Sequence, residues 1–364
     1  MKKFTLFKGN KLKKLLLALL VLAVAFLAGC KGKDKSAEKP TKVTVMIYSE
    51  YIDPAMLTDF ESKTGYKLQL ELYEAQEEMI SKLQTVGTAQ YDVIIASDVV
   101  IQQMIHLGLI GKIDMNKIPN RVNIADQFRN PSYDPTNEYT IPYLWGTTGI
   151  LYRDSTIDPL HVSYSMLFDA KQTKGKFSLL EESRSMLSMA LQAKGFDANS
   201  TNKDEINQAV EYILQAKKDP HFLGFDGSVG GKDKVLSKMD WAAIVFNGEA
   251  MAAIDEDPSL QFAIPEEGSF MWVDAMTLSS KAPNVDGAYQ FMNYILDANI
   301  GAQLAKYINY ATPNNASLEA LDKEFTGNRV INPTADEIKR MVFLKDPGDA
   351  ARLFDEAWTI VKTR

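Results

Sequence analysis

The fold is decided by residues 43–60, which read VTVMIYSEYIDPAMLTDF. Branched apolar residues stand at every second position from residue 43 to residue 47, and this period of two predicts a strand. Asp53 and Pro54 follow as an N-cap and a first-turn proline, so we expect a helix that begins here and ends at Gly65. The segment therefore predicts a strand followed directly by a helix.

The same alternation continues along the chain. A second strand is predicted over residues 66–73, a helix over 77–85, and a buried strand over 91–95 that leads into a helix cap at Ser97–Asp98. This order predicts an α/β fold with a mostly parallel sheet. Ligands of such sheets lie beyond the carboxyl ends of the strands, which here are residues 48–51 and 97–98.

Further along, residues 139–153 are apolar and interrupted by proline and glycine, as expected for an extended crossing to a second α/β domain. A helix capped near Thr201 or Asn202 is predicted from its apolar spacing. Residues 224–232 are rich in glycine but lack the P-loop spacing, so a surface loop is expected there. A strand that could cross back is predicted over 271–278, followed by helices over 288–296 and 300–307.

The composition is that of a soluble globular protein, with 46% hydrophobic and 24% charged residues in a chain of 364, which is enough for two domains. One Cys and three scattered His exclude a disulfide framework and give no zinc-type spacing, so neither a metal nor a cofactor is expected. The net charge is −7, and it becomes −13 from residue 30 onward, because residues 1–29 contain six Lys and no acid. Such a surface repels nucleic acid and tolerates cations.

Residues 1–29 are predicted to be an export signal. A lysine-rich start precedes the uncharged residues 15–29, a stretch too short for a membrane-spanning helix. It ends Leu-Ala-Gly-Cys30 and resembles the bacterial lipobox, in which the cysteine is lipidated after cleavage just before it. Residues 30–42 are charged, small and contain proline, which predicts a flexible tether. The folded protein would then lie outside the cytoplasmic membrane, anchored by the lipid alone; the alternative is that Cys30 is a buried free cysteine of an ordinary helix.

Carboxylates and aromatic rings recur at the predicted strand ends. Glu50 and Tyr51 follow the first strand, Asp98 follows the third, and Trp272 and Asp274 lie in the strand that crosses back. Each alone is typical of a helix cap or a core residue. Together they suit an ammonium group, because a desolvated cation needs a carboxylate partner and is attracted to aromatic faces.

Six segments resemble, in order and with similar spacing, the motifs of the spermidine/putrescine-binding proteins of bacterial ABC importers. The likeness runs from about Val43 to the C-terminus. The segments are YSEYIDP (48–54), YDVI with Ser97 (91–97), IPYLWGT (141–147), FNG (246–248), WVD (272–274) and NYATPN (309–314).

The resemblance implies a two-domain α/β venus-flytrap fold, of the type II periplasmic-binding-protein kind, with two interdomain crossovers. A first lobe would comprise residues 43–145 and 275–312, and a second lobe residues 146–274 and 313–364. The implied function is that of an extracytoplasmic lipoprotein, not an enzyme, which captures putrescine or spermidine between the lobes. The implied partners are this polyamine and an ABC permease with its cytoplasmic ATPase; the protein itself is expected to be a monomer that contacts no nucleic acid.

Carried over residue by residue, the resemblance implies carboxylates for the ammonium groups and aromatic walls for the methylene stem. The implied ligand-binding residues are Tyr48, Ser49, Glu50, Tyr51, Ser97, Asp98, Glu182, Phe246, Glu249, Trp272, Asp274 and Tyr310. The chain departs from many relatives at Val99, Ser185 and Leu344, where the family often has an aromatic, an acidic and a polar residue. Glu249 matches an acid of putrescine-selective relatives. These differences favour a short diamine, which we expect to bind at least as tightly as spermidine.

Three other functions remain open from the sequence. The same fold could hold another cation, such as an agmatine-like amine or ferric iron bound by tyrosine and carboxylate oxygens. An extracellular acid/base hydrolase would use Glu181 and Glu182, or Glu50 and Asp274, although the sequence lacks a Gly-x-Ser-x-Gly motif. A structural adhesin would bind no small ligand saturably.

Overall fold

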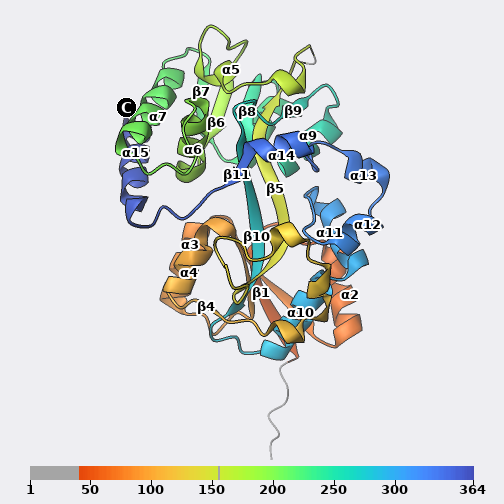
Figure 1. Ribbon diagram of the computed structural model, residues 1–364. Helices are drawn as coiled ribbons and strands as arrows, with labels where there is room; N and C mark the ends of the chain where they lie inside the picture. The colour runs from red at the N-terminus through yellow and green to blue at the C-terminus, as the bar shows by residue number, and fades with distance from the viewer. Residues whose placement is uncertain (1–40, 155) are drawn as a thin grey trace, which may run out of the picture. The chain divides into compact units, whose positions relative to one another are not determined.

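Two long antiparallel strands, β5 (Thr140–Tyr152) and β10 (Ser269–Ser279), lie side by side in the middle of the sheet and connect its two halves (Figure 1). The strand order is β2-β1-β3-β10-β5-β8-β6-β7, with β4 and β11 paired to β10 and β9 paired to β5. The two crossings predicted from the sequence are these two strands. The structure, a computed structural model, describes residues 41–154 and 156–364. The predicted signal peptide, the lipidation site Cys30 and the predicted tether up to residue 40 lie outside the described residues.

The strand-helix alternation predicted for the first half of the sheet is confirmed. β1 (Lys42–Tyr48) pairs in parallel with both β2 (Lys67–Tyr73) and β3 (Val93–Ser97), and β10 joins β3 in the antiparallel direction. The helices and the short strand of this half are α2 (Pro54–Thr64), α3 (Gln76–Val86), α4 (Asp98–His106), β4 (Ile110–Gly111), α10 (Val285–Ile295) and α11 (Ala298–Ile308). The α/β class is thus confirmed.

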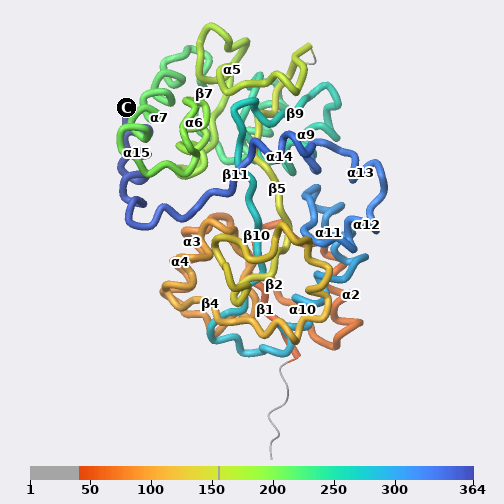
Figure 2. The backbone as a smooth tube through the Cα atoms, viewed as in Figure 1, coloured from red at the N-terminus to blue at the C-terminus, as the bar shows by residue number. Residues whose placement is uncertain are grey.

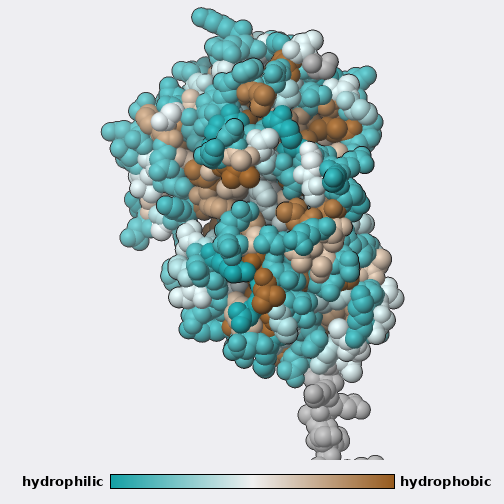
Figure 3. All heavy atoms as spheres, turned by 45° about the vertical axis from the view of Figure 1, so that its right-hand side comes forward, coloured by the Kyte–Doolittle hydropathy of each residue, from teal (hydrophilic) through white to brown (hydrophobic). Residues whose placement is uncertain are grey.

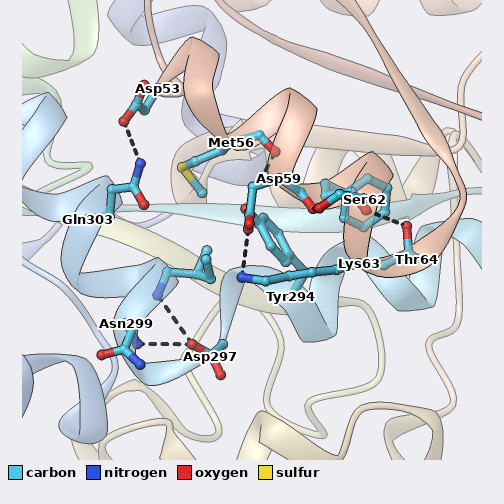
Figure 4. Close-up of polar contacts among 12 residues, drawn as sticks. Asp53, Met56, Asp59, Ser62, Lys63, Thr64, Tyr294, Asp297, Asn299 and Gln303 are labelled. Atoms are coloured by element: carbon cyan, nitrogen blue, oxygen red, sulfur yellow. Dashed lines mark hydrogen bonds and ion pairs between the residues drawn. The ribbon is translucent and has the colours of Figure 1, made fainter.

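Both ends of helix α2 are set by residues that stand next to it in the sequence. The Asp53 side chain caps its first turn by accepting a hydrogen bond from Ala55 N at 2.9 Å, and Gly65 ends it with a left-handed φ of 75°. A polar network then ties α2 to α10 and α11 (Figure 4). Tyr294 Oη donates to Asp59 at 2.7 Å, and Gln303 Nε2 donates to Asp53 at 2.7 Å.

The second half of the sheet is built around β8 (Ala242–Phe246), which pairs antiparallel with β5 and parallel with β6 (Phe177–Leu180). β7 (Phe222–Asp226) continues this half beyond β6, and β9 (Gln261–Ala263) pairs with the end of β5. The helices of this half are α5 (Ser165–Phe168), α6 (Ser183–Ala193), α7 (Lys203–Lys217), α8 (Ser228–Leu236) and α9 (Asn247–Glu256). The helix predicted to be capped near Thr201 or Asn202 is α7, whose N-cap is Asn202.

The surface loop expected over residues 224–232 is wrong. These residues form the end of β7 and the first half of α8. A Cβ atom added to Gly231 would lie 3.1 Å from Ala243 Cβ and 3.4 Å from Val245 Cγ1. The glycine therefore allows α8 to pack closely against β8, a reason for glycine that the local sequence does not reveal.

The C-terminal region adds elements to both halves. α12 (Asn315–Ala320) packs on α11, β11 (Met341–Phe343) pairs in parallel with the start of β10, and α15 (Ala351–Thr363) packs on α6 and α7. The backbone trace shows this return of the chain from the α11–α12 region to the α6–α7 region (Figure 2). The remaining helical segments are α13 (Lys323–Gly327), α14 (Ala335–Arg340) and the 3-10 turns Met115–Lys117, Pro119–Asn123, Asp126–Phe128, Pro159–His161 and Gly348–Ala350.

The core lies on both faces of the central sheet. Its largest fully buried side chains include Phe60 and Phe291 of the first half and Tyr152 and Phe177 of the second. Figure 3 shows mainly hydrophilic side chains on the viewed surface, with hydrophobic ones gathered in patches, several of them at mid-height. Within residues 41–154 and 156–364, no helix has the length and apolar character that crossing a membrane requires.

Candidate functional site

The ends of β1 and β3 meet the middle of β10, and this meeting point positions the site. Asp274 of β10 lies directly opposite Ser97, the last residue of β3. Tyr51, in the turn after β1, donates a hydrogen bond of 2.6 Å from its hydroxyl to Asp274 Oδ2. Residues that are distant in the sequence thus come together where the strand order predicts a ligand site.

The turn that carries Tyr51 is held by its own backbone conformation and by a hydrogen bond from β5. Glu50 adopts a left-handed φ of 56°, which turns the chain sharply after β1. The Tyr143 hydroxyl of β5 then donates to the carbonyl oxygen of Tyr51 at 2.7 Å. Tyr51 is therefore held by its backbone as well as by its own hydroxyl, and its ring is buried.

Aromatic rings from both halves of the sheet pack around Asp274. The Trp272 and Tyr310 centroids are 4.8 Å apart at an interplanar angle of 86°, and Phe246, at the end of β8, meets Trp272 edge-on at 5.8 Å. Tyr51 approaches Tyr310 at 6.0 Å, and Tyr48 approaches Tyr51 at 5.6 Å. Such edge-to-face pairs give a rigid apolar wall with defined ring orientations.

Two glycines make this packing possible. A Cβ atom on Gly146 of β5 would lie 2.3 Å from Trp272 Cζ2, and one on Gly248 of α9 would lie 2.4 Å from Tyr310 Cε1. Both distances are far below van der Waals contact. These positions therefore require the absence of a side chain so that the two rings can occupy their places.

Two carboxyl groups of the first half are deeply buried. Burial raises the pKa of Asp274 to about 7, against the lowering effect of the Tyr51 hydrogen bond. Burial also raises the pKa of Asp98 to about 7, with Ser97 Oγ donating to Asp98 Oδ1 at 3.0 Å and the charge of Asp274 opposing ionisation. Asp98 Oδ2 has no hydrogen-bond partner among the described residues. Both groups therefore titrate in the physiological range.

The second half contributes two more carboxylates. Tyr310 Oη donates to Glu249 Oε2 at 3.0 Å, and Ser185 Oγ donates to Glu182 Oε2 at 2.8 Å. Solvent reaches the Glu182 side chain, yet the surrounding protein and the charges of Glu77 and Glu249 raise its pKa. Surrounding protein likewise raises the pKa of Glu249. We call the residues from both halves the site cluster: Tyr48, Tyr51, Glu182, Phe246, Glu249, Trp272, Asp274 and Tyr310.

The site cluster carries negative charge without a matching cation. In residues 41–154 and 156–364, no ion pair includes Asp98, Glu182, Glu249 or Asp274. Their side-chain hydrogen-bond donors are hydroxyl groups of Tyr and Ser, which do not neutralise a carboxylate. Aromatic walls with unneutralised carboxylates can bind an organic cation, because the apolar stem gains from burial while each positive end finds a partner.

Not every residue proposed from the sequence joins this cluster. Ser97 and Asp98 lie next to Asp274, as described above. Ser49 Oγ instead donates to Glu74, and Glu50 is exposed on its turn, with no hydrogen bond to the site cluster among the described residues. Of the three positions at which the resemblance implied a departure, Ser185 and Leu344 are buried and Val99 is half-buried.

The sequence also left some contributors unnamed. Tyr143 lies within a quoted motif, but only the fold shows that its hydroxyl supports Tyr51. Tyr73, whose ring centroid lies 4.3 Å from that of Tyr48, ends a strand with no other functional signal, and Glu77 looks like an ordinary first-turn acid of α3. Position in the fold, and not residue type, is what brings them to the site.

Among the described residues, features outside the site cluster give weaker support for a binding site. No group of three or more His, Cys, Asp or Glu in residues 41–154 and 156–364 is arranged to hold a metal ion. One cavity of about 300 Å³ lies beside Phe128 and Arg129, and another of about 350 Å³ lies beside Arg153 and Trp241. Neither cavity is lined by a residue of the site cluster.

Comparison with known proteins identifies the family of this chain. The family model of the bacterial extracellular solute-binding proteins matches residues 55–331. A spermidine/putrescine-binding periplasmic protein of Haemophilus influenzae is 30% identical over 347 residues, which cover 93% of this chain and 95% of that protein. A putrescine/cadaverine-binding protein of Pseudomonas aeruginosa is 28% identical over 358 residues, with coverage of 95% and 99%.

The likeness extends to three dimensions. The solved structure of a spermidine/putrescine ABC transporter substrate-binding protein from Streptococcus pneumoniae is 28% identical, with a TM-score of 0.77, and the match covers 88% of this chain and 99% of that one. The periplasmic-binding-protein fold expected from the sequence is therefore confirmed.

Proposed function

This chain belongs to the bacterial extracellular solute-binding proteins, and from that premise we propose that it captures a polyamine and delivers it to an ABC permease. The family consists of solute-binding proteins and not of enzymes. The further step, that this chain itself catalyses no reaction, is part of the proposal. It is supported by relatives that are named as binding proteins and by a site cluster that combines carboxyl groups with aromatic rings.

One observation carries the proposal: four carboxylates, Asp98, Glu182, Glu249 and Asp274, share one region with no cationic side chain paired to them. Asp98 and Asp274 are buried, and burying a charged carboxylate is unfavourable unless a cation completes the site. A diamine does so with two ammonium ends, and its methylene stem fits against the rings of Trp272 and Tyr310.

The proposed ligand-binding residues are those of the sequence analysis, but we propose that they contribute to binding to different extents. Asp274 is the central carboxylate, Glu249 and Glu182 serve the second half, and the aromatic members of the site cluster form the walls. Ser97 and Asp98 support Asp274 from the adjacent strand. Ser49 and Glu50 stay in the set as residues of the turn that carries Tyr51, at the margin of the site.

We propose a short diamine as the preferred ligand. Relatives are named for spermidine and putrescine in one case and for putrescine and cadaverine in another. Ser185 supplies a hydroxyl to Glu182 where many relatives have a second acid, so a third ammonium group would find fewer partners here. An unpaired buried ammonium is strongly unfavourable, whereas a diamine leaves none.

Capture would proceed by closure of two lobes around the ligand, the first comprising residues 43–145 and 275–312 and the second residues 146–274 and 313–364. Closure removes water from the ammonium–carboxylate pairs, and the permease would recognise the closed form because the ligand favours it. The protein is proposed to act as a monomer, with the ATPase engaged through the permease.

The proposed location is outside the cytoplasmic membrane, with a lipid on Cys30 as the anchor. It is supported by the lipobox-like sequence and by the periplasmic relatives. The predicted tether would leave the folded part free to reach a permease in the same membrane.

The test is a calorimetric titration of residues 43–364 with putrescine, cadaverine, spermidine and agmatine, and with ferric iron as the competing ligand class. The proposal expects saturable one-to-one binding of at least one diamine and no iron-dependent tyrosinate absorption. Iron binding without amine binding would replace the polyamine with a metal cargo. No saturable binding at all would favour a structural role.

A further inference from the structure

A C-terminal segment, residues 341–346, begins with a pairing to the residues of β10 directly before Trp272; we call it the strap. Its first three residues are β11, which pairs in parallel with residues 269–271 of β10, with Phe343 opposite Met271. One position further along the two chains stand Leu344 and Trp272. The pairing thus brings the strap alongside the part of β10 that leads into Trp272, and Leu344 is buried.

The strap is held to the second half of the sheet by two side chains. Asn199 Nδ2 donates to the Phe343 carbonyl oxygen at 3.0 Å, and Asn199 Oδ1 accepts from Lys345 N at 2.8 Å. Arg184 Nη2 donates to that same Oδ1 at 2.8 Å and to the Lys345 carbonyl oxygen at 3.2 Å. The Asn199 amide and the Arg184 guanidinium thus hold the backbone on both sides of Leu344 by hydrogen bonds.

Arg184 also fixes the first turn of α6. Its Nη1 donates to Ser188 Oγ at 2.9 Å and to the Ala198 carbonyl oxygen at 3.3 Å, and its guanidinium carbon lies 4.4 Å from the Phe354 ring centroid. Glu182, the N-cap residue of α6, stands two residues before it. The hydrogen bonds of Arg184 to Asn199 and Lys345 thus anchor the start of α6, where Glu182 is the N-cap residue.

We propose that Arg184 and Asn199 are positioning residues of the amine site, which hold Glu182 and Leu344 at fixed places relative to Trp272 and Asp274. The inference rests on the proposed function, because its consequence is read out as amine affinity. Neither residue touches the site cluster through its own side chain; they act through α6 and through the strap.

The guanidinium is suited to this role in a way that an ammonium is not. Arg184 serves four acceptors in different directions with one planar group that also stacks on an aromatic face. A lysine keeps the charge but presents its donors from a single nitrogen, so it cannot serve the Nη1 acceptors Ser188 and Ala198 and the Nη2 acceptors Asn199 and Lys345 at the same time. Arg184→Lys therefore tests geometry with little change in net charge.

The experiment measures the dissociation constant of putrescine for wild type, Arg184→Lys, Glu182→Gln and the double variant. Arg184→Lys is expected to raise the dissociation constant about tenfold, which corresponds to about 1.4 kcal/mol. In the Glu182→Gln background the same substitution is expected to have much less effect, because the carboxylate that it positions is gone. A substitution that only loosened the fold would have equal effects in both backgrounds.

Arg153→Lys is the matched control. Arg153 lies in the same half of the sheet and is also held by several bonds, to Asp257 at 2.6 Å, Ser259 at 3.2 Å and the Val235 carbonyl at 3.0 Å, but none of these leads to the site cluster. It is expected to lower thermal stability without changing the dissociation constant. If Arg184→Lys does not fold, Asn199→Asp replaces it, since this variant keeps the acceptor for Arg184 and Lys345 N and loses only the donor to Phe343.

The outcomes separate the inference from the proposed function. If wild type binds no amine, the proposed function fails first. If wild type binds putrescine and Arg184→Lys or Asn199→Asp binds it equally well, or if the effects with Glu182→Gln are fully additive, the positioning role is overturned while the polyamine site stands.

Discussion

The hydroxyl of Tyr51 donates a 2.6 Å hydrogen bond to Asp274 across 223 positions of sequence. This bond satisfies one oxygen of a buried carboxyl group and leaves the other lone pairs available to a ligand. It does not neutralise the charge, and burial still raises the pKa of Asp274 to about 7. Tyr51 therefore orients the carboxylate, and the partner that we propose for it is an ammonium group of the ligand.

Amine affinity is expected to fall as the pH is lowered from 8 to 5.5. Asp274 must be ionised to pair with an ammonium, and its pKa of about 7 means that a proton has to leave before the ligand binds at acidic pH. Each such carboxyl group weakens binding by at most about tenfold per pH unit below its pKa. Calorimetry in two buffers of different ionisation heat should show proton release at pH 6.5. Proton uptake, or a dissociation constant that stays constant over this range, would contradict the assignment.

Asp98→Asn is expected to stabilise the ligand-free protein at pH 8 and to have little effect near pH 4. The folded-state pKa of Asp98, about 7, lies above its ordinary value of 3.8, so the folded protein holds this proton more tightly than the unfolded chain does. The contribution of Asp98 to the free energy of unfolding is therefore largest below pH 4 and is lost as the pH rises through 7. The substitution should recover about 4 kcal/mol at pH 8, because the pKa differs by about three units between the folded and the unfolded state. Thermal unfolding of both proteins across this range measures it; equal differences at both ends would show that Asp98 does not titrate this way.

Glu249→Gln is expected to weaken putrescine binding more than spermidine binding. Glu249 is the carboxylate of α9 that accepts the Tyr310 hydroxyl, and a diamine has few other partners for its second ammonium. Competition between the two amines on wild type, repeated on Glu249→Gln, gives the selectivity directly. A clear wild-type preference for spermidine that Glu249→Gln leaves unchanged would mean that other acids serve the ligand.

Cys30→Ser is expected to release the protein from membranes or to block its maturation. A thioether-linked lipid on Cys30 is the proposed anchor, and a hydroxyl cannot take its place. Fractionation of cells that express each form, with the size of the mature chain determined, measures the effect. A cleaved Cys30→Ser chain that still pellets with membranes would show that another anchor exists.

Much of the fold could be predicted because its signals are local. Asp53, Pro54 and Gly65 mark the two ends of α2 within a dozen residues, and the apolar alternation of β1 is visible without tertiary context. The α8 helix was missed because glycine usually signals a loop, whereas Gly231 is used here for close packing on β8. Long-range packing overrides local propensity at such positions.

Of the candidate site, the sequence predicts only those residues whose chemical type by itself suggests a binding role. Trp272 and Asp274 stand out as an aromatic and a carboxylate in one strand, but Tyr143 acts through a single hydroxyl on the Tyr51 carbonyl oxygen. Arg184 acts through the backbone of residues that lie more than 150 positions away. Such support depends on which segments the fold places side by side, and a sequence pattern does not contain that information.

The central claim is that Asp274 is the carboxylate that pairs with a bound amine, and the most direct measurement is the calorimetric titration of wild type and Asp274→Asn with putrescine at pH 8. Asp240→Asn is the control, since Asp240 is another buried acid that accepts a serine hydroxyl, away from the site cluster. Asp274→Asn is expected to weaken binding by about 2–5 kcal/mol, because it leaves the ammonium without its charged partner. Asp240→Asn should leave the dissociation constant unchanged. An unchanged dissociation constant in a correctly folded Asp274→Asn protein would contradict the claim.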